Sequence, residues 1–155
     1  MSGARRGKVV TRDAAGTDAA GTMWIGTGKG LTAFRNGRLV GSFTNGLPTQ
    51  LISALAEDRE GHLWLGAEAG LFRSTEPVHC ADRTCDVHFV QVRPETFARE
   101  YIRVIYEDRH GVIWIGTNLN GVFRYQNQQL TSYTDRNGLS NNAVRDLVED
   151  QGGSL

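Results

Sequence analysis

The chain has 155 residues, which is enough for one ordinary domain that buries roughly two-thirds of its unfolded surface. Its 17 basic and 17 acidic side chains balance, which argues against nucleic-acid binding, since that needs a basic surplus to attract phosphates. The sequence has no apolar run of about 18 residues, the length that spans a bilayer, and its basic start lacks the apolar core of a secretory signal.

Glycine and tryptophan recur along the chain in similar sequence contexts. There are 19 glycines but only three prolines, which favours short strands joined by tight turns. Three segments, 23–27, 63–67 and 113–117, each place a tryptophan between apolar residues and ahead of a glycine. Their tryptophans lie 40 and 50 residues apart. A recurrence at this period indicates an internal repeat.

A turn precedes two of these segments at a constant distance. Asp58 and Asp108 each stand six positions before a tryptophan, and Gly61 and Gly111 close the same two turns. An aspartate at the start of such a turn bonds nearby backbone N–H groups, and a glycine at its end takes a positive φ. We therefore assign these four residues to the framework of the repeat.

Short strand-like runs flank each turn and each tryptophan segment. Four short strands in a period of about 40 residues are typical of one blade of a β-propeller. We predict an all-β chain of about three four-stranded blades, which form an incomplete arc of a larger propeller. In the second unit the predicted strands are 52–57, 62–67, 70–74 and about 87–92, and the runs 102–107 and 144–149 have the pattern of 52–57.

The register of the repeat divides the chain into units. Residues 1–17 are expected to be a poorly ordered segment or a remnant strand, with 9–11 as the strand candidate. Residues 150–155 copy the pattern of 58–63, so 151–155 is predicted to be the truncated start of a further blade. The three blade units between them are 18–58, 59–108 with an insertion at 75–88, and 109–150.

The repeated tryptophans admit two interpretations. An exposed indole stacks on sugars, but a residue repeated at one strand position between apolar neighbours is typical of packing between blades. A glycine after the tryptophan lets a neighbouring backbone approach closely. We expect six such residues to be structural: Trp24, Gly26, Trp64, Gly66, Trp114 and Gly116.

Two cysteines lie in the insertion of the second unit. Cys80 and Cys85 flank a polar stretch of four residues, as on the two arms of a hairpin, and we expect a disulfide between them. An alternative is a zinc site formed with His79 and His88, although alternation along a strand points one histidine away. Free thiols are the third interpretation. We predict no metal and no cofactor for the chain.

One face of the blades offers variable polar groups. In an up-and-down blade, the connection between the second and third strands shares a face with the connection to the next blade. Both connections differ from unit to unit here, and recognition is built on such variable loops. The alternative is that they are ordinary solvated loops. The candidate ligand contacts are Gln50, Arg99, Glu100, Asn118, Asn120, Asn141 and Asn142.

The sequence contains few features that indicate catalysis. No nucleophile elbow, phosphate-binding loop or His-Glu-x-x-His motif occurs. The acid pairs 57–58, 107–108 and 149–150 have the composition of a glycosidase site, but they recur in every unit at a turn. We interpret them as turn and strand-end residues, and we predict that this chain is not an enzyme.

The motifs at 57–73, 107–125 and 137–144 resemble the two-component regulator propeller repeat, and the resemblance covers roughly 18–155 apart from the insertion. In that family, such repeats build large propellers in the periplasmic sensing half of bacterial membrane sensors, commonly hybrid histidine kinases that feed a phosphorelay. The resemblance implies that the chain is a ligand-sensing fragment of such a sensor, located in the periplasm. The signal it implies is a small molecule derived from a carbohydrate.

The expected partners are the remaining blades of the parent propeller or another copy of the chain, and a small-molecule or oligosaccharide ligand. Neither nucleic acid nor direct membrane insertion is expected. A second interpretation is a self-assembling structural or protein-interaction propeller module without a kinase, because an arc of blades leaves two unpaired faces. A third interpretation is a lyase or glycosidase built on a propeller.

Overall fold

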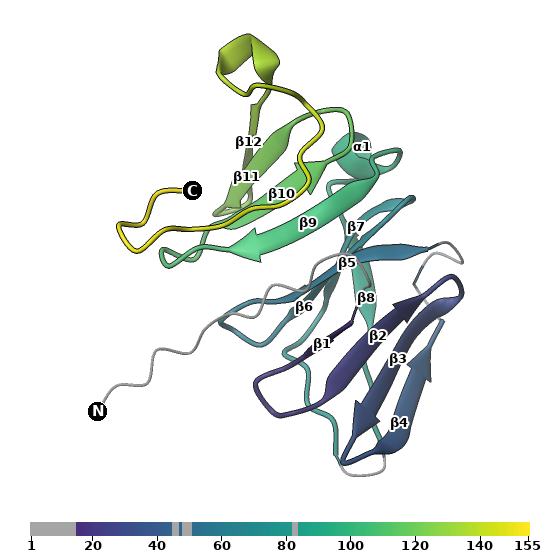
Figure 1. The fold of residues 1–155 in the computed structure, drawn as a ribbon. Coiled ribbons are helices and arrows are strands. Elements are labelled where there is room, and N and C mark those ends of the chain that lie inside the picture. Colours follow the sequence, from purple (N-terminus) through teal and green to yellow (C-terminus); the bar gives the residue numbers. More distant parts are fainter. Residues whose placement is uncertain (1–14, 45–46, 48–50, 82–83) are drawn as a thin grey trace.

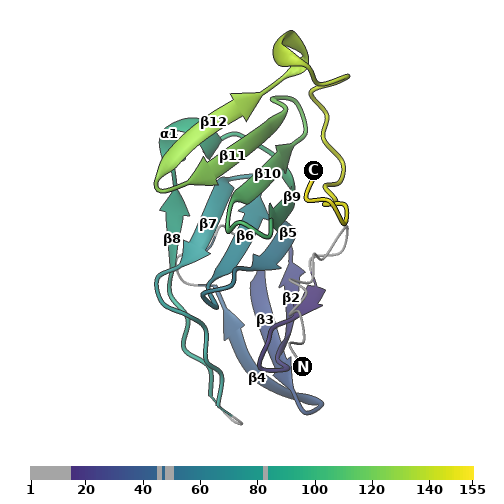
Figure 2. The same ribbon diagram turned by 90° about the vertical axis from the view of Figure 1, so that its left-hand side faces the viewer.

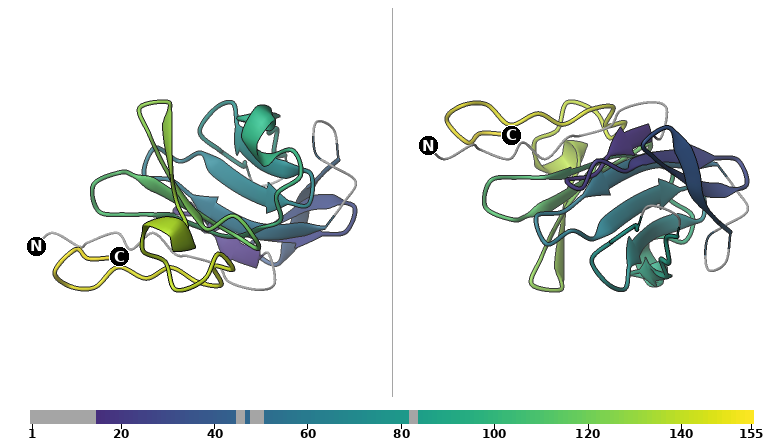
Figure 3. Two further views of the ribbon diagram at one scale, coloured as in Figure 1. Left: turned by 90° about the horizontal axis from the view of Figure 1, so that it is seen from above. Right: turned by 90° about the horizontal axis from the view of Figure 1, so that it is seen from below.

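The computed structural model describes residues 15–44, 47, 51–81 and 84–155, which form three antiparallel sheets of four strands (Figure 1). The sheets follow one another in chain order (Figure 3), and within each sheet every strand pairs with the next one along the chain. The chain is therefore an open arc of three propeller blades, as predicted. The first sheet holds β1 (Ala15–Thr17), β2 (Met23–Thr27), β3 (Gly30–Arg35) and β4 (Arg38–Phe43). The second sheet holds β5 (Ile52–Glu57), β6 (Leu63–Ala67), β7 (Gly70–Ser74) and β8 (Phe89–Val92). The third sheet holds β9 (Ile102–Glu107), β10 (Ile113–Thr117), β11 (Val122–Gln126) and β12 (Gln129–Tyr133).

The four strands of the second sheet are those predicted for the second unit, but the predicted unit bounds divide the chain one strand later than the sheets do. β5 pairs with β6, with Leu55 opposite Leu65, so it belongs to the second sheet although the predicted first unit extends to residue 58. β9 belongs to the third sheet for the same reason. β1 pairs with β2 and is the remnant first strand of the first blade. The predicted strand at 9–11 lies outside the described residues.

The predicted strand at 144–149 is not a strand in the structure. The described residues contain no strand that pairs with it, and a ladder needs such a partner. The segment instead runs beside β9 (Figures 1 and 2), held at its start by a bond from the N–H of Val144 to the carbonyl of Thr117 at 2.9 Å. This segment therefore packs on the third blade in the way that the next blade would.

The apolar core lies between the sheets, because each sheet buries its faces against its neighbours. One cluster joins the first and second blades and includes Trp24, which is 1% exposed. A second cluster joins the second and third blades, and the indole of Trp64 packs there against Tyr125 with ring centroids 5.7 Å apart. Trp114 is half-buried beside Tyr133. Trp24 and Trp64 therefore lie at the seams between the described blades, and Trp114 holds the same strand position in the third blade.

Two short helices lie in the connections, and neither was predicted from the sequence. α1 (Pro94–Phe97) follows the second blade and buries Phe97 completely, edge-on to Phe123 with ring centroids 5.1 Å apart. A 3₁₀ turn at Asp135–Asn137 follows the third blade and is capped by Thr134. The first helix closes the top of the seam between the second and third blades, and so it positions the loops that follow it.

Candidate ligand-binding face

The aspartate turns form the structural face of the blades. Asp58 accepts the N–H groups of Glu60 and His62 through Oδ1, at 3.0 and 2.9 Å, and the indole N–H of Trp64 through Oδ2 at 2.9 Å. Asp18 and Asp108 make the corresponding bonds in the other blades. Each aspartate thus holds its own turn and its own tryptophan.

The glutamate before each aspartate reaches the neighbouring blade. Glu107 accepts the backbone N–H and the Nε of Arg59, each at 2.6 Å. Burial raises the pKa of Glu107, although the Arg59 bonds oppose the shift. Glu149 accepts the N–H and Nε of Arg109 in the same way, at 3.1 and 2.5 Å. The acid pairs therefore have structural roles at turns and seams, in agreement with our interpretation.

The opposite face gathers the predicted variable loops. The connection from α1 to β9, the loop between β10 and β11, and the segment after β12 meet there. The N–H of Asn118 donates to the carbonyl of Tyr101 at 3.1 Å, and the N–H of Gly121 donates to the carbonyl of Asn142 at 2.9 Å. These bonds join three connections that lie far apart in the sequence into one surface.

A guanidinium contacts two of these connections. Arg103, the second residue of β9, donates from Nε to Oδ1 of Asn118 at 2.7 Å and lies over the ring of Tyr101, 5.5 Å from its centroid. In the same two connections, the amide of Asn120 donates to the carboxylate of Glu100. The contacts with Asn118 and Tyr101 therefore fix the orientation of the Arg103 side chain. The guanidinium has further N–H donors that a ligand could use.

The structure unites some of the predicted contact residues and separates others. Asn142 accepts the N–H of Asp135 at 2.8 Å and stays close to the loop of Gly121. Arg99 is exposed, and Asn141 is exposed and bonds only the N–H of Ala143 among the described residues. Gln50 lies outside the described residues. The surface thus consists of Glu100, Asn118, Asn120 and Asn142 around Arg103 and Tyr101.

Arg103 was missed by our sequence analysis, although the sequence carries a signal for it. The apolar first position of the inner strand recurs in the three units as Ile52, Ile102 and Val144, and it is followed by a polar residue in each unit, which is arginine at 103 and 145. In the second blade that position is Ser53, whose hydroxyl donates to the carbonyl of Ile102 at 2.5 Å. A polar residue inside an otherwise apolar inner strand points to the same surface as the variable loops.

The zinc alternative for the insertion is wrong. Cys80 and Cys85 form a disulfide, so neither sulfur is a thiolate ligand. His88 points into solvent with 77% of its side chain exposed, and it lies 3.5 Å from the carboxylate of Asp86. The hairpin is therefore closed by a covalent bond between its arms.

One other group has the composition of a metal site. Asp58, Glu60 and His62 bring their ligand atoms within 4.8 Å of one another. The guanidinium of Arg73 already lies among them, 2.8 Å from Nδ1 of His62 and 3.4 Å from the carboxylate of Glu60, and it stacks over Trp64. A cation of the protein itself thus already pairs with both carboxylates, and we assign no metal to this group.

Two segments of the chain, residues 46–69 and 96–119, match the family described as the two component regulator propeller. No curated protein matches the sequence of the chain. The chain is similar to the extracellular domain of BT3049 from B. thetaiotaomicron, described as a hybrid two component system, with 26% identity and a TM-score of 0.70. That match covers 92% of this chain and 19% of the other.

A second similar structure is the extracellular domain of BT4673 from B. thetaiotaomicron, described as a one component system, with 23% identity and a TM-score of 0.68. It shares the fold over 97% of this chain, which covers 22% of its length. The chain therefore spans about a fifth of either structure. Within its described residues, the chain has no helix long and apolar enough to cross a membrane.

Proposed function

We propose that this chain, a run of two component regulator propeller repeats, supplies three consecutive blades to the ligand-sensing propeller of a two-component sensor. Its role is binding rather than catalysis. The likeness to an extracellular domain of a hybrid two component system supports this role and a location outside the cytoplasm, in the periplasm. The disulfide also supports that location, because disulfides persist in oxidising compartments. The parent protein is a membrane-bound sensor histidine kinase.

The observation that carries the binding role is the polar surface around Arg103. It joins a guanidinium, an aromatic ring, a carboxylate and two side-chain amides on the face where the connections vary. Amide and carboxylate groups pair with the hydroxyls of a sugar, and a guanidinium pairs with a carboxylate in two parallel bonds. The surface therefore fits a small carbohydrate-derived ligand, and Arg103 favours one that carries an acidic group.

Titration calorimetry with a panel of neutral and uronate-containing di- to hexasaccharides tests this role. A saccharide that binds the chain should lose about ten- to hundredfold in affinity on Arg103→Ala, because a hydrogen bond to a charged group contributes about 1.5–3 kcal/mol. Asn120→Ala should weaken the same saccharide less. The control is Arg38→Ala, which removes an exposed arginine from β4 in the first blade.

Equal losses for Arg103→Ala and Arg38→Ala would place the ligand elsewhere on the blades. If no saccharide of the panel binds the chain, the same substitutions belong in the parent propeller, with kinase activity as the readout. A parent sensor that responds normally with Arg103 and Asn120 both replaced by alanine contradicts the proposed surface.

A further partner is expected on the first blade. Leu63 and Ile113 occupy one strand position and are buried in the core shared with the preceding blade. Met23 holds the same position in β2, but 48% of it is exposed. A large apolar side chain at a repeated packing position supports the proposal that another blade, from the parent propeller or from a second copy, covers this face.

Light scattering over a range of protein concentrations tests the second-copy version of this proposal, which also carries the alternative of a self-assembling structural module. We expect concentration-dependent association that Met23→Lys weakens. Leu119→Lys is the control, because Leu119 is 71% exposed on a loop rather than on the sheet face. A chain that is monomeric at every concentration contradicts self-assembly and leaves the parent blades as the partner.

A further inference from the structure

An arginine bridges the seam between the second and third blades. The guanidinium of Arg59 bonds Glu107 at 2.6 Å and the carbonyl of Asp108 at 2.7 Å. It also covers Gly111, where a Cβ would lie 3.2 Å from the guanidinium carbon. The turn of one blade is thus fastened to the inner strand and turn of the next.

The same contacts recur at a third seam, between the third blade and the C-terminal segment that packs on it. Arg109 bonds Glu149 and the carbonyl of Asp150, each at 2.5 Å, and its guanidinium covers Gly153 at 3.2 Å from a Cβ there. Desolvation raises the pKa of the Glu149 carboxyl, but the Arg109 bonds outweigh it and hold that pKa below its ordinary value. At both seams, therefore, an arginine bonds a glutamate and an aspartate carbonyl and covers a glycine. We call this set of contacts the arginine clasp.

The seam between the first and second blades lacks the arginine. Ala19 stands at the position of Arg59 and Arg109. Its N–H still donates to Glu57 at 2.8 Å, but among the described residues no guanidinium reaches that carboxylate. Burial accordingly raises the pKa of Glu57, with Asp18 and Asp58 adding to the shift. The carboxylate is present at this seam, and the part of the chain that the structure describes supplies no guanidinium to it.

The disulfide hairpin occupies the place of the missing guanidinium. Gly61 is the counterpart of Gly111, and a Cβ there would lie 3.4 Å from Cβ of Pro77. The N–H of Val78 donates to the carbonyl of Gly61 at 2.8 Å. The first arm of the hairpin therefore covers the glycine that an arginine covers at the other two seams.

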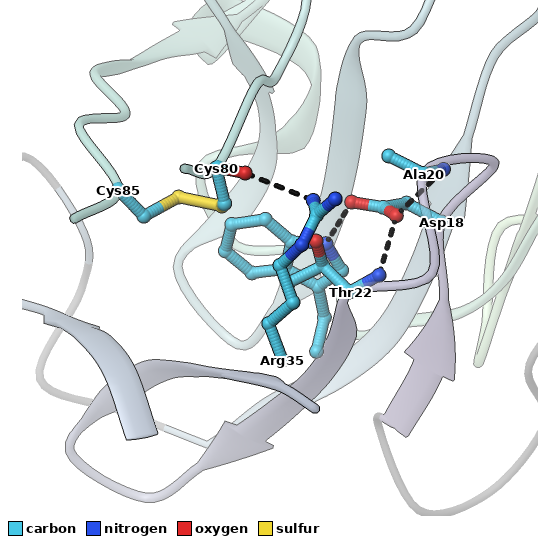
Figure 4. The surroundings of a disulfide bond; sticks show 7 residues. Asp18, Ala20, Thr22, Arg35, Cys80 and Cys85 are labelled. Carbon is cyan, nitrogen blue, oxygen red and sulfur yellow. Dashed lines mark hydrogen bonds between the residues drawn. A yellow bond between two sulfur atoms is a disulfide. The ribbon is translucent and has the colours of Figure 1, made fainter. Parts of the chain in front are cut away.

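The hairpin also fastens to the first blade. Arg35 extends from β3 and donates to the carbonyl of Cys80 at 2.9 Å (Figure 4). A Cβ at Gly41 would lie 3.5 Å from Cβ of Cys85. Figure 2 shows the hairpin extending from the second blade alongside the first. Three of its apolar residues, Val78, Cys80 and Val87, are buried in the cluster that contains Trp24, as is Phe89 at the start of β8.

We propose that the hairpin at 75–88 replaces the arginine clasp, and that its disulfide makes the first seam sensitive to reduction while the other two seams are not. A dithiol reductant attacks the disulfide and becomes a disulfide itself. The bond between Cys80 and Cys85 breaks, and each sulfur takes one hydrogen from the dithiol. The two arms then lose their covalent closure, and the anchors on both blades weaken together.

Hydrogen exchange of the full chain, with and without dithiothreitol, tests the proposal. Reduction should speed the exchange of the Val78 amide and of the amides of β2 and β3 by at least tenfold. The amides of Arg59 and Arg109, which belong to the arginine clasps, should change less than twofold. Equal acceleration at all three seams, or none at the first, would overturn the proposal.

The double substitution Cys80→Ser with Cys85→Ser provides a matched control. It should exchange at the first seam like the reduced chain, and dithiothreitol should have no further effect on it. A response to dithiothreitol in this variant would contradict the assignment to the disulfide. Reduction of the folded wild-type chain gives the same comparison if the variant fails to fold.

A rescue experiment separates clasping from general stability. In the double serine variant with Pro77→Ala, Ala19→Arg should restore slow exchange at the first seam, because an arginine there can reach Glu57 and cover Gly61. In the oxidised wild-type chain the same change should have little effect, because Pro77 already covers Gly61. Ala20→Arg in the same turn is the control. Equal effects of Ala19→Arg in both backgrounds would show that the hairpin and the arginine do not substitute for each other.

Discussion

The indole N–H of Trp64 donates to Oδ2 of Asp58 at 2.9 Å, while Oδ1 of the same carboxylate accepts two backbone N–H groups of the turn. Asp18 with Trp24, and Asp108 with Trp114, make the same bond at 2.9 and 2.8 Å. One carboxylate therefore orients the side chain that fills the seam to the next blade. The constant spacing of six residues between aspartate and tryptophan is the spacing that this bond requires.

Asp58→Ala should lower the free energy of unfolding by about 2–4 kcal/mol. The change leaves the buried N–H groups of Trp64 and His62 without acceptors, and one unsatisfied buried donor costs about 1–3 kcal/mol. Urea unfolding followed by tryptophan fluorescence measures the loss. Glu60→Ala in the same turn is the control, because 69% of the Glu60 side chain is exposed. A loss no larger than that of the control contradicts the role of Asp58.

Asp108 should make the chain less stable in acid. Desolvation raises the pKa of its carboxyl, but the bonds from Trp114 and two backbone N–H groups outweigh it, so the pKa is lowered on folding. The unfolded state then binds the proton more readily, and the stabilisation is present above the unfolded pKa and lost as pH falls through the folded pKa. Asp108→Asn should flatten the acid side of the stability profile measured by urea unfolding. An unchanged acid slope would exclude Asp108 as its source.

Glu57 should have the opposite pH dependence. Burial, with help from Asp18 and Asp58, raises its pKa on folding. Its contribution to stability is therefore present below the unfolded pKa and is lost as pH rises through the folded pKa. Glu57→Gln keeps an acceptor for the N–H of Ala19 and should make the chain more stable at neutral pH but not in acid. Parallel unfolding series at both pH values test this, and a gain of equal size in acid would contradict it.

Gly66→Ala should destabilise the chain by about 1–3 kcal/mol, the usual cost of overpacking a core. A Cβ at Gly66 would lie 2.6 Å from Cβ of Ile102 and 3.1 Å from that of Ala54, so two strands of neighbouring blades would have to move. Thermal unfolding of the chain measures the effect. Gly28→Ala is the matched control, since nothing lies within 4 Å of a Cβ there. If both changes shift Tm equally, the close approach is not the cause.

Phe97→Ala should lower the free energy of unfolding by about 3–5 kcal/mol, as expected for a buried phenylalanine. Phe97 has no exposed surface and closes the seam between the second and third blades against Phe123. The same change should weaken any ligand bound around Arg103, because the loop after α1 carries Glu100. Val90→Ala on β8, where 51% of the valine is exposed, is the control. An equal effect of both changes on urea unfolding contradicts the role of Phe97.

The strands and turns were predictable because each depends on residues close in sequence. β5, β6 and β7 lie within one residue of their predicted bounds, and the bonds of Asp58 stay within its own turn and strand. Repetition added a second source of evidence, since each motif appears again in the same order. The exception was 144–149, whose strand pattern is the same but whose partner strand is not among the described residues.

The candidate ligand-binding face was only partly predictable. Topology placed Glu100, Asn118, Asn120 and Asn142 on one side, and the structure joins them there. Arg103 was not predicted, because it belongs to a strand, and the predicted contacts came from loops alone. Whether a polar residue on an inner strand faces the core or the ligand face depends on how the sheets are packed.

The sequence by itself determined the repeat, its four strands and the turn chemistry, because these follow from local propensity and from spacing within one blade. Only the tertiary structure decided what fastens one blade to the next. Arg59 and Glu107 are 48 residues apart, and Arg35 and Cys80 are 45 residues apart. Such pairs form only after the blades and the hairpin have packed against one another. The exchange of an arginine for a disulfide hairpin at one seam depends on that packing.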